Sequence, residues 1–286
     1  MSTHETAATE AHVLLSGLAF GESPRWHDGR LWFANWLRQE IIAVAPEGQS
    51  EVMLRVPFDS FPFSIDWLPD GRLLLTSMQD RPLMRQEPDG TLVEHAALPR
   101  GVNEIVVDGH GNIFVNGPRF DPSTGGFAPG GIALVTPDGA SREVAAGIQF
   151  PNGMAITPDD RTLIIADSYA RALLAFTIDR DGSLSNRRVW ADLGAGTPDG
   201  ICLDAEGCVW YADVPNRRCV RVREGGEVLQ TITLDRGAFA CMLGGDDGKT
   251  LFITAAAWHG FERMADGLGS GQVLTARVAV PHGGRP

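Results

Sequence analysis

One short phrase recurs six times along this 286-residue chain. Each copy has a short apolar strand, a turn rich in Gly and Asp, and a second strand rich in β-branched and aromatic residues. The copies start 42, 39, 49, 47 and 42 residues apart, at Glu22, Ser64, Asn103, Asn152, Asp199 and Cys241. A period of this length that contains several short strands is typical of a β-propeller.

Every interval leaves room for two more strands after the phrase. In the fourth repeat these are ALLAFTI at 172–178 and RRVWA at 187–191, joined by the turn DRDG. Long amphipathic helical patterns are absent from the sequence, which disfavours an α/β fold. Six repeats of four antiparallel strands therefore predict an all-β fold, a six-bladed β-propeller.

The two ends of the chain complement each other. After Cys241 only three strands are evident in the sequence, and the last of them is QVLTARVAV at 272–280. The unassigned strand HVLLSG at 12–17 is therefore predicted to supply the outer strand of the last blade, which closes the ring and removes its free edges. We expect residues 1–11 to form a disordered tail and residues 12–286 to form a single propeller domain.

The charge balance limits the partners of the chain. It has 36 acidic and 24 basic residues, a net charge of −12, which argues against nucleic acid or an anionic membrane surface as a partner. No stretch is apolar enough to span a membrane, and the first residues lack a signal-peptide pattern, so we expect a cytoplasmic protein. None of the four cysteines belongs to a CxxC pair, and reduced core thiols are expected.

The pair Asn152–Gly153 opens the fourth repeat and has two interpretations. Asn-Gly is a strong signal for a tight hairpin turn, but this repeat already has its own hairpin turn at 159–161. In an up-and-down blade the innermost strand starts on the face to which the second strand returns, so the first residues of the six phrases surround one axis. We therefore interpret Asn152 as a ligand at the mouth of the central channel.

The residues at the strand starts favour a metal site. Glu22, Asn152 and Asp199 form a set of oxygen ligands, which suits Ca²⁺, Mg²⁺ or Mn²⁺ better than a structural zinc ion. Three protein ligands leave coordination positions open for water and substrate, and this is the arrangement of a catalytic site.

The ends of the second strands and their neighbours are predicted to bind substrate as pocket walls, through Trp36, Phe63, Tyr169, Trp258 and His259. His259 acts either as a general acid or base or as a hydrogen-bonding wall residue. The connection at 117–131 is unusually long and contains Arg119, which we also assign to substrate binding. This connection either covers the site or is an ordinary surface excursion.

Four stretches carry a resemblance to a known family, namely GESPRW around Glu22, VNEIVVDGHGNIFVNG around Asn103, FPNGMAITPDDRTLIIADS around Asn152 and TPDGICLDAEGCVWYADV around Asp199. Over residues 12–280 the chain resembles the SMP-30/gluconolactonase/LRE-like family of six-bladed propellers. The resemblance implies that Glu22, Asn152 and Asp199 bind a divalent metal and that Asn103 lies near metal and substrate. Ca²⁺ is the first choice of metal, with Zn²⁺, Mn²⁺ and Mg²⁺ as alternatives.

The chain departs from the sugar-lactonase pattern before its third blade. Those members often read Arg-x-Asn-Asp, in which the Arg binds substrate hydroxyls. This chain reads Gly101-Val102-Asn103-Glu104, with Arg100 one residue out of register. Asn103 and Glu104 remain candidates for substrate contact. Together with the aromatic wall residues, the departure predicts a bulkier or less polar lactone than that of a free sugar acid.

Members of the family characteristically hydrolyse lactones, and some relatives cleave organophosphates. We therefore predict a divalent-metal-dependent lactonase, a carboxylic ester hydrolase, that acts on a small-molecule lactone or ester as a monomer or homodimer. The metal polarises the carbonyl, and the attacking water is either held by the metal or deprotonated by Asp199 as the catalytic base. Two alternatives stay open, an organophosphate-hydrolysing, phosphotriesterase-like propeller and a non-catalytic small-molecule-binding propeller.

Overall fold

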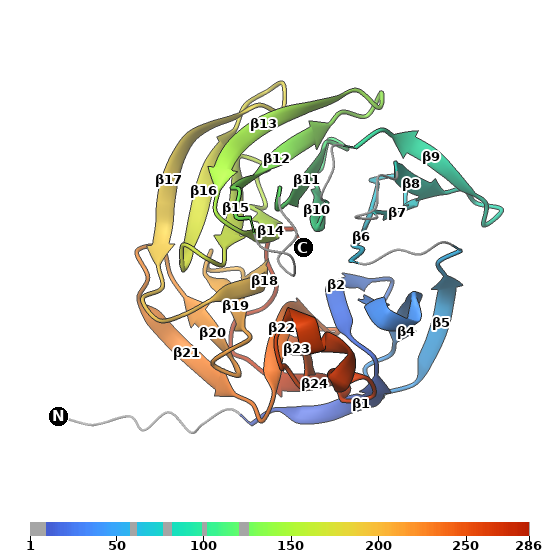
Figure 1. Cartoon of the computed structure of the whole chain (residues 1–286), viewed down its shortest axis with the longest axis vertical. Helices are drawn as coiled ribbons and strands as arrows, with labels where there is room; N and C mark the ends of the chain where they lie inside the picture. Colours follow the sequence, from blue (N-terminus) through green and yellow to red (C-terminus); the bar gives the residue numbers. More distant parts are fainter. Residues whose placement is uncertain (1–9, 58–61, 77–81, 99–101, 120–125, 286) are drawn as a thin grey trace.

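The computed structural model of the chain describes residues 10–57, 62–76, 82–98, 102–119 and 126–285. Within these ranges, six four-stranded antiparallel sheets stand around a central axis like the blades of a propeller (Figure 1). This arrangement confirms the predicted all-β, six-bladed fold. No helix within the same ranges has the length and apolar character needed to cross a membrane. Residues 1–9 of the expected disordered tail lie outside the described residues.

In blades 1 to 5 the strands follow one another outward from the axis. Blade 1 has β2 (Gly21–His27), β3 (Arg30–Asn35), β4 (Glu40–Val44) and β5 (Ser50–Arg55), and blade 2 has β6 (Ile65–Trp67), β7 (Leu73–Leu75), β8 (Leu83–Gln86) and β9 (Leu92–Ala96). Blade 3 has β10 (Glu104–Val107), β11 (Ile113–Gly117), β12 (Gly130–Val135) and β13 (Ser141–Ile148). Blade 4 has β14 (Pro151–Ile156), β15 (Thr162–Asp167), β16 (Ala172–Ile178) and β17 (Leu184–Asp192). Blade 5 has β18 (Pro198–Leu203), β19 (Val209–Asp213), β20 (Arg218–Val222) and β21 (Val228–Thr233).

Blade 6 combines strands from both ends of the chain. It consists of β22 (Gly237–Gly244), β23 (Thr250–Ala256), β24 (Gly271–Arg277) and, outermost, β1 (His12–Leu18). Two short 3₁₀ helices, η1 (Trp36–Arg38) and η2 (Phe261–Gly267), follow the second strands of blades 1 and 6.

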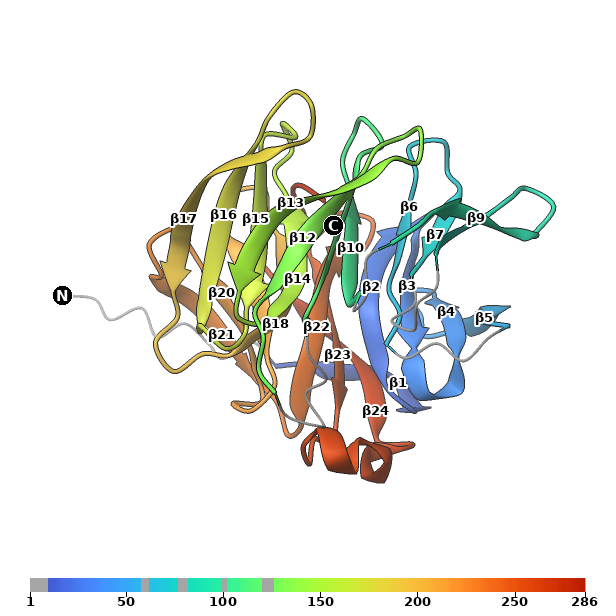
Figure 2. The same ribbon diagram turned by 45° about the horizontal axis from the view of Figure 1, so that its top comes forward.

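Hydrophobicity decreases from the inner to the outer strands because burial decreases in the same direction. Met154, Ala155 and Ile156 of β14 are at most 1% exposed, since neighbouring blades cover both faces of an innermost strand. Figure 2 shows β10, β14, β18 and β22 side by side along the axis. The outermost strand β17 is largely exposed or half-buried, and Val189 on it is 62% exposed.

The ring is closed by the pairing of β1 with β24. The two strands are antiparallel, with His12 opposite Thr275 and Leu18 opposite Gly271. This pairing confirms the predicted closure by an N-terminal strand. The last strand ends three residues earlier than predicted, because the chain leaves the sheet after Arg277.

Beyond β24 the chain crosses the axis on one face of the ring. Isolated antiparallel bridges join Asp204 to His282 and Ile156 to Arg285. Ile156 and Asp204 lie at the far ends of the innermost strands of blades 4 and 5, and Figure 1 shows the C-terminus near the centre of the ring. The opposite face, on which the innermost strands begin, is called the site face below.

Cys241 does not lie at the start of its strand, which corrects the repeat alignment. β22 already begins at Gly237, and Cys241 is 2% exposed, with its thiol 3.5 Å from the Trp210 carbonyl oxygen. The register shift near the start of this strand lies between Ala238 and Ala240, upstream of Cys241. The four cysteines of the chain are free and buried.

Deleting residues 1–18 should destabilise the protein, because the deletion removes β1 and leaves the edge of β24 unpaired. Leu14, Leu15 and Leu18 pack in the core of blade 6, and the loss of one buried leucine side chain costs about 2–5 kcal/mol. We expect a lower melting temperature by circular dichroism and self-association by light scattering. Deletion of residues 1–9 is the matched control and should change neither. An unchanged melting temperature without β1 would contradict its role in closure.

Candidate metal centre

As in β22, a β-bulge interrupts the innermost strand of three further blades close to the start of that strand. The register with the second strand breaks between Glu22 and Arg25 in β2, between Pro151 and Met154 in β14, and between Pro198 and Ile201 in β18. Bulges bend a strand, change the direction of its side chains and are frequent next to active sites. Asn152 and Asp199 lie in these bulges, and Glu22, which pairs with Ala34, lies at the edge of its bulge.

Gly153 and Gly200 let neighbouring innermost strands approach each other directly behind the predicted ligands. A Cβ atom on Gly153 would lie 2.7 Å from the Asp199 carbonyl oxygen, and one on Gly200 would overlap the Ala240 side chain. A larger residue would therefore push the strands apart. The hairpin of this repeat is formed by residues 157–161, so the Asn152–Gly153 pair serves strand packing at the axis and not a hairpin turn.

Asn152 links the blades on either side of it. Its side-chain oxygen accepts a long hydrogen bond of 3.4 Å from the Asn103 amide, and its own amide donates to the Ser168 hydroxyl at 3.4 Å. Ser168 in turn donates to the carbonyl oxygen of Pro198 at 2.6 Å, one residue before Asp199. Polar groups from three successive blades therefore meet at the start of the innermost strands.

Two acidic side chains at this site repel each other. Burial raises the pKa of Glu22 well above its ordinary value, and the negative charges of Asp199 and Glu104 raise it further. A hydrogen bond from the Ser23 main chain and the positive charge of Arg25 lower this pKa by smaller amounts. Burial and the charge of Glu104 raise the pKa of Asp199 from 3.8 to about 8, although a hydrogen bond with Asn152 lowers it. The surrounding residues therefore compensate the negative charges of Glu22 and Asp199 only in part.

Glu104 carries its negative charge in a different setting. Its Oε1 atom accepts hydrogen bonds from the Arg25 guanidinium at 2.9 Å and from the Ser23 hydroxyl at 3.2 Å, and the Ser64 hydroxyl donates to the same oxygen. Ser23 reaches this position because it adopts a left-handed conformation (φ 50°) in the bulge of β2. The predicted substrate contact Glu104 is thus anchored in the wall of the channel. Sequence reasoning did not assign Ser23 or Arg25 to the site, although both belong to GESPRW.

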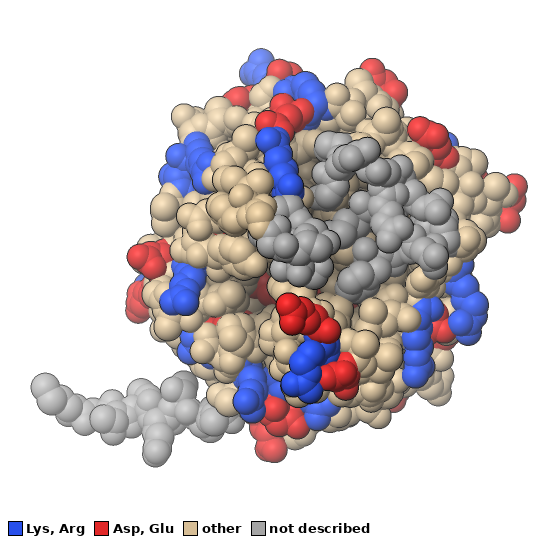
Figure 3. Space-filling view, in the orientation of Figure 1, with Lys and Arg blue, Asp and Glu red and all other residues tan. Residues whose placement is uncertain are grey.

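Eight aromatic rings form an arc on the site face, here called the aromatic arc. Successive ring centroids lie 4.3 to 6.4 Å apart in the order Phe127, Tyr169, Phe150, Phe261, Trp258, Phe239, Phe20 and Trp36. Trp36, Tyr169 and Trp258 were predicted as wall residues. The five phenylalanines were not, although Phe20 and Phe150 each stand two residues before a predicted ligand. Figure 3, which looks onto this face, shows most charged side chains toward the rim.

Three other predicted substrate contacts are placed differently. Phe63 has no exposed surface and belongs to the hydrophobic core of blades 1 and 2, which corrects its assignment to a pocket wall. Arg119 forms an ion pair with Glu143 on the flank of blade 3. His259 is exposed and precedes η2. Two parts of the prediction lie outside the described residues, namely Arg100 and residues 120–125.

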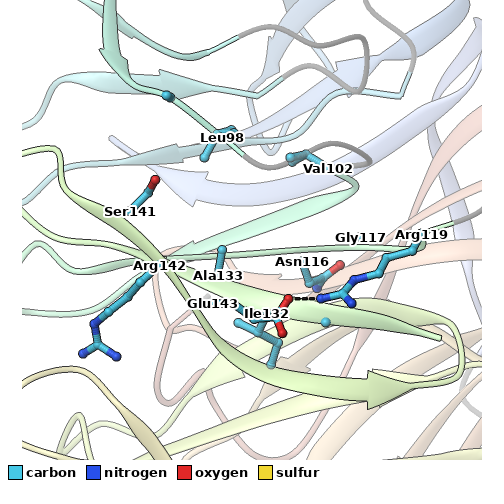
Figure 4. A pocket seen from close by; sticks show the side chains of 12 residues that line it. Leu98, Val102, Asn116, Gly117, Arg119, Ile132, Ala133, Ser141, Arg142 and Glu143 are labelled. Atoms are coloured by element: carbon cyan, nitrogen blue, oxygen red, sulfur yellow. Dashed lines mark ion pairs between the residues drawn. The ribbon is translucent and has the colours of Figure 1, made fainter.

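A cavity of about 310 Å³ lies between blades 2 and 3 (Figure 4). Leu98 and Val102 line it from one side, and Ala133 of β12 lines it from the other. Asn116 of β11 also belongs to its wall, and the Asn116 amide donates to the main-chain oxygen of Asn152 at 2.6 Å. None of the three predicted ligands lines this cavity.

The chemistry of the donor set fits a hard divalent cation. The part of the chain that the structure describes has no group of three His, Cys, Asp or Glu side chains arranged to hold a metal. The predicted set instead combines the carboxylates of Glu22 and Asp199 with the Asn152 amide oxygen. A divalent cation compensates the repulsion that raises the pKa of both carboxyl groups, and oxygen-only ligands suit Ca²⁺.

Comparison with known proteins places the chain in a family. The family model described as the SMP-30/Gluconolactonase/LRE-like region matches residues 20–257, and the chain belongs to this family. A 6-deoxy-6-sulfogluconolactonase from Pseudomonas putida is 31% identical over 157 residues, which are 53% of this chain and only 54% of that protein. The pentonolactonase XacC from Haloferax volcanii is 25% identical over 291 residues, which are 97% of each protein.

The fold is shared with solved structures of related sequence. A crystal structure described as a calcium-binding protein, regucalcin, from Agrobacterium tumefaciens matches with a TM-score of 0.78 at 22% identity. The match covers 96% of this chain and 95% of that one. At this identity the likeness shows the common fold.

Metal-free protein should lose stability as the pH rises from about 4 to about 8. The folded-state pKa of Asp199 is about 8 instead of 3.8, so the folded protein keeps a proton that the unfolded chain has released, and the free energy of unfolding falls across this range. Melting temperatures in EDTA measure the slope. Asp199→Asn should flatten it, whereas Glu262→Gln on exposed η2 should not. Equal slopes for wild type and D199N would contradict the assignment.

Proposed function

We propose that this protein is a divalent-metal-dependent lactonase. Relatives named as a 6-deoxy-6-sulfogluconolactonase and a pentonolactonase support the reaction class. The observation that carries the proposal is the pair of mutually repelling carboxyl groups, Glu22 and Asp199, beside the Asn152 amide at the start of three innermost strands. These three side chains would hold the metal, with Ca²⁺ as the first choice and Zn²⁺, Mn²⁺ or Mg²⁺ as alternatives. The substrate is a small-molecule lactone or ester.

The metal and the residues around it have separate roles in lactone hydrolysis. A bound divalent cation supplies Lewis-acid polarisation of the lactone carbonyl. Asp199 accepts the proton of the attacking water and returns it to the leaving ring oxygen, and burial keeps this carboxylate more basic than an exposed one, although a cation reduces the effect. The Asn103 amide, which reaches the Asn152 oxygen, orients the water or the carbonyl. The Glu104 carboxyl group, anchored by the Arg25 guanidinium, lies beside them.

The aromatic arc supports a bulkier or less polar lactone than gluconolactone. Phe127, Tyr169 and Phe261 expose 55%, 46% and 44% of their surface on the site face. Aromatic rings at a pocket mouth gain free energy by covering apolar surface of a ligand, and polyhydroxylated rings offer little of it. The arc therefore favours aryl- or alkyl-substituted lactones.

Asp199→Asn should lower kcat for lactone hydrolysis by about 10²–10⁴-fold, the usual contribution of a general base, and additionally weaken metal binding. The matched control is Glu262→Gln, which removes an exposed carboxylate of η2 and should keep full activity. Hydrolysis is followed by pH-stat titration, and EDTA should abolish it until Ca²⁺ is restored.

Three outcomes would overturn this function. Full turnover by D199N with an unchanged fold would show that the site is misplaced. Turnover of paraoxon that exceeds that of all lactones by orders of magnitude would favour the phosphotriesterase-like alternative. Purified protein that binds no divalent metal by calorimetry and turns over no lactone would favour a binding propeller.

Dihydrocoumarin should be hydrolysed with a higher kcat/KM than gluconolactone. Tyr169→Ala and Phe261→Ala should each lower kcat/KM for dihydrocoumarin by about tenfold, because an aromatic contact contributes on the order of 1 kcal/mol. The same variants should change gluconolactone turnover by less than about twofold. Val189→Ala, at an exposed apolar residue of β17, is the control. A strong preference of the wild type for gluconolactone would contradict the assignment of the arc.

A further inference from the structure

The second strand of each blade that carries a predicted metal ligand ends on a buried Asn or Asp. These residues, here called the clamp residues, are Asn35 of β3, Asp167 of β15 and Asp213 of β19, and each is at most 1% exposed. Each stands across the sheet from the residue directly before a ligand, in the pairs Gly21–Asn35, Pro151–Asp167 and Pro198–Asp213. Buried polar side chains of this kind need hydrogen-bond partners.

In blade 4 the clamp residue holds the main chain that leads to Asn152. The Asp167 carboxylate accepts hydrogen bonds from the main-chain amides of Gln149 and Phe150, each at 2.9 Å. It also accepts one from the Ala170 amide at 3.2 Å. Hydrogen bonds to a carboxylate are stronger than those between neutral groups. The first two amides belong to the third and second residues before the ligand, so Asp167 fixes the segment that enters β14.

Blade 1 has the same arrangement with a side-chain amide as the acceptor. Asn35 Oδ1 accepts hydrogen bonds from the main-chain amides of Ala19 at 3.0 Å and Phe20 at 3.1 Å. The Asn35 nitrogen donates to the Glu40 carboxylate at 3.1 Å, and because a carboxylate only accepts, this contact sets the orientation of the amide. The bonded residues are again the third and second before the ligand, Glu22.

Blade 5 has one such hydrogen bond, and a cation supports its clamp residue. Asp213 Oδ1 accepts from the main-chain amide of Thr197, the second residue before Asp199, at 3.2 Å. Arg218 Nε donates to Asp213 Oδ2 at 2.9 Å, and the Asn216 amide donates to both carboxylate oxygens. These partners compensate the buried charge, so the carboxylate is held in place for the Thr197 amide.

Blade 6 shows that a bulge alone does not require a clamp residue. Its innermost strand also has a bulge near the start, but the pair that corresponds to Gly21–Asn35 is Gly237–Ala256. The Ala256 side chain cannot accept a hydrogen bond. The residue that follows Gly237, in the place of the ligand, is Ala238. The ligand and the clamp residue are therefore missing together in this blade.

We propose that Asn35, Asp167 and Asp213 are positioning residues of the candidate metal centre, an inference that rests on the proposed function. Each acts through the main chain and fixes the entry segment of one ligand-bearing strand. The ligand oxygens then converge before a cation arrives, and binding does not have to order three separate segments of chain. Residues that orient metal ligands in this way typically contribute about 10- to 100-fold to metal affinity.

Calcium binding tests the clamp residue of blade 4. Asp167→Ala should raise the Ca²⁺ dissociation constant by about 10- to 100-fold in isothermal titration, because the segment before Asn152 loses its acceptor. The matched control is Asp108→Ala, in the hairpin after β10 on the face opposite the site. Asp108 is also buried, and it accepts hydrogen bonds from the main-chain amides of His110 and Asn112 at 2.8 Å.

The two variants should lose a similar amount of stability, measured as the melting temperature in EDTA, but only one should lose metal affinity. The Ca²⁺ dissociation constant of D108A should stay within about twofold of the wild type, because distant sites act independently. An unchanged dissociation constant in D167A would overturn the proposal. An equal rise in both variants would also overturn it, since the effect would then be one of general destabilisation.

Asp167→Asn provides a second test that does not depend on the folding of D167A. The new side chain keeps an oxygen for the Phe150 amide and loses the acceptor of the Gln149 amide. Its Ca²⁺ dissociation constant should rise by about three- to tenfold, because about one hydrogen bond is lost. Asp108→Asn is the control and should bind Ca²⁺ like the wild type, and circular dichroism verifies that each variant is folded. Equal dissociation constants for D167N and D108N would contradict the proposal.

Comparison of metal binding with turnover separates a failure of the clamp residues from a failure of the proposed function. Weaker Ca²⁺ binding by D167A alone supports the clamp even if no lactone is hydrolysed, in which case the lactonase proposal fails by itself. In an active lactonase, saturating Ca²⁺ should bring kcat of D167A to within about threefold of the wild type, whereas D199N should stay impaired. Equal Ca²⁺ affinity of the wild type, D167A and D108A would overturn the clamp and leave the lactonase proposal intact.

Discussion

The pairing of β1 with β24 is the interaction on which the rest of the structure depends. It joins the two ends of the chain in one blade and leaves the described sheets without an open seam. β2 follows β1 directly and packs against β22 across this seam. Glu22 therefore reaches the axis beside Asp199, although the two residues lie in opposite halves of the sequence. A propeller that opened at this seam would separate the carboxyl groups that define the candidate metal centre.

The acidic side chains at the channel have two kinds of surroundings. The Glu104 carboxyl group accepts hydrogen bonds from Arg25 and from two serine hydroxyls, and these bonds link blades 1, 2 and 3. Burial raises the pKa of Glu22 and of Asp199, and neighbouring negative charges add to the shift, those of Asp199 and Glu104 at Glu22 and that of Glu104 at Asp199. The contrast distinguishes a carboxylate that is held by an ion pair from two whose negative charge is disfavoured, and the latter two are the carboxylates that we propose as metal ligands.

The surroundings of this cluster are divided between apolar and polar groups. The aromatic arc runs from blade 3 through blades 4 and 6 to blade 1, and a cavity lies between blades 2 and 3. Sequence patterns predicted three members of the arc, because they follow second strands in phase with the repeat. They missed Phe261, since a ring on a short helix has no periodic signal.

The sequence by itself determined the six-bladed fold, the closing strand and the convergence of Glu22, Asn152 and Asp199. A fixed repeat places the start of every phrase at the same position relative to one axis, so phase alone carries this information. Only the tertiary structure decided that these three residues lie in or beside β-bulges, that Phe63 belongs to the core and that Arg25 anchors the neighbouring glutamate. Those features depend on how adjacent sheets pack and bend against each other, and the residue pattern of a single strand does not encode that geometry.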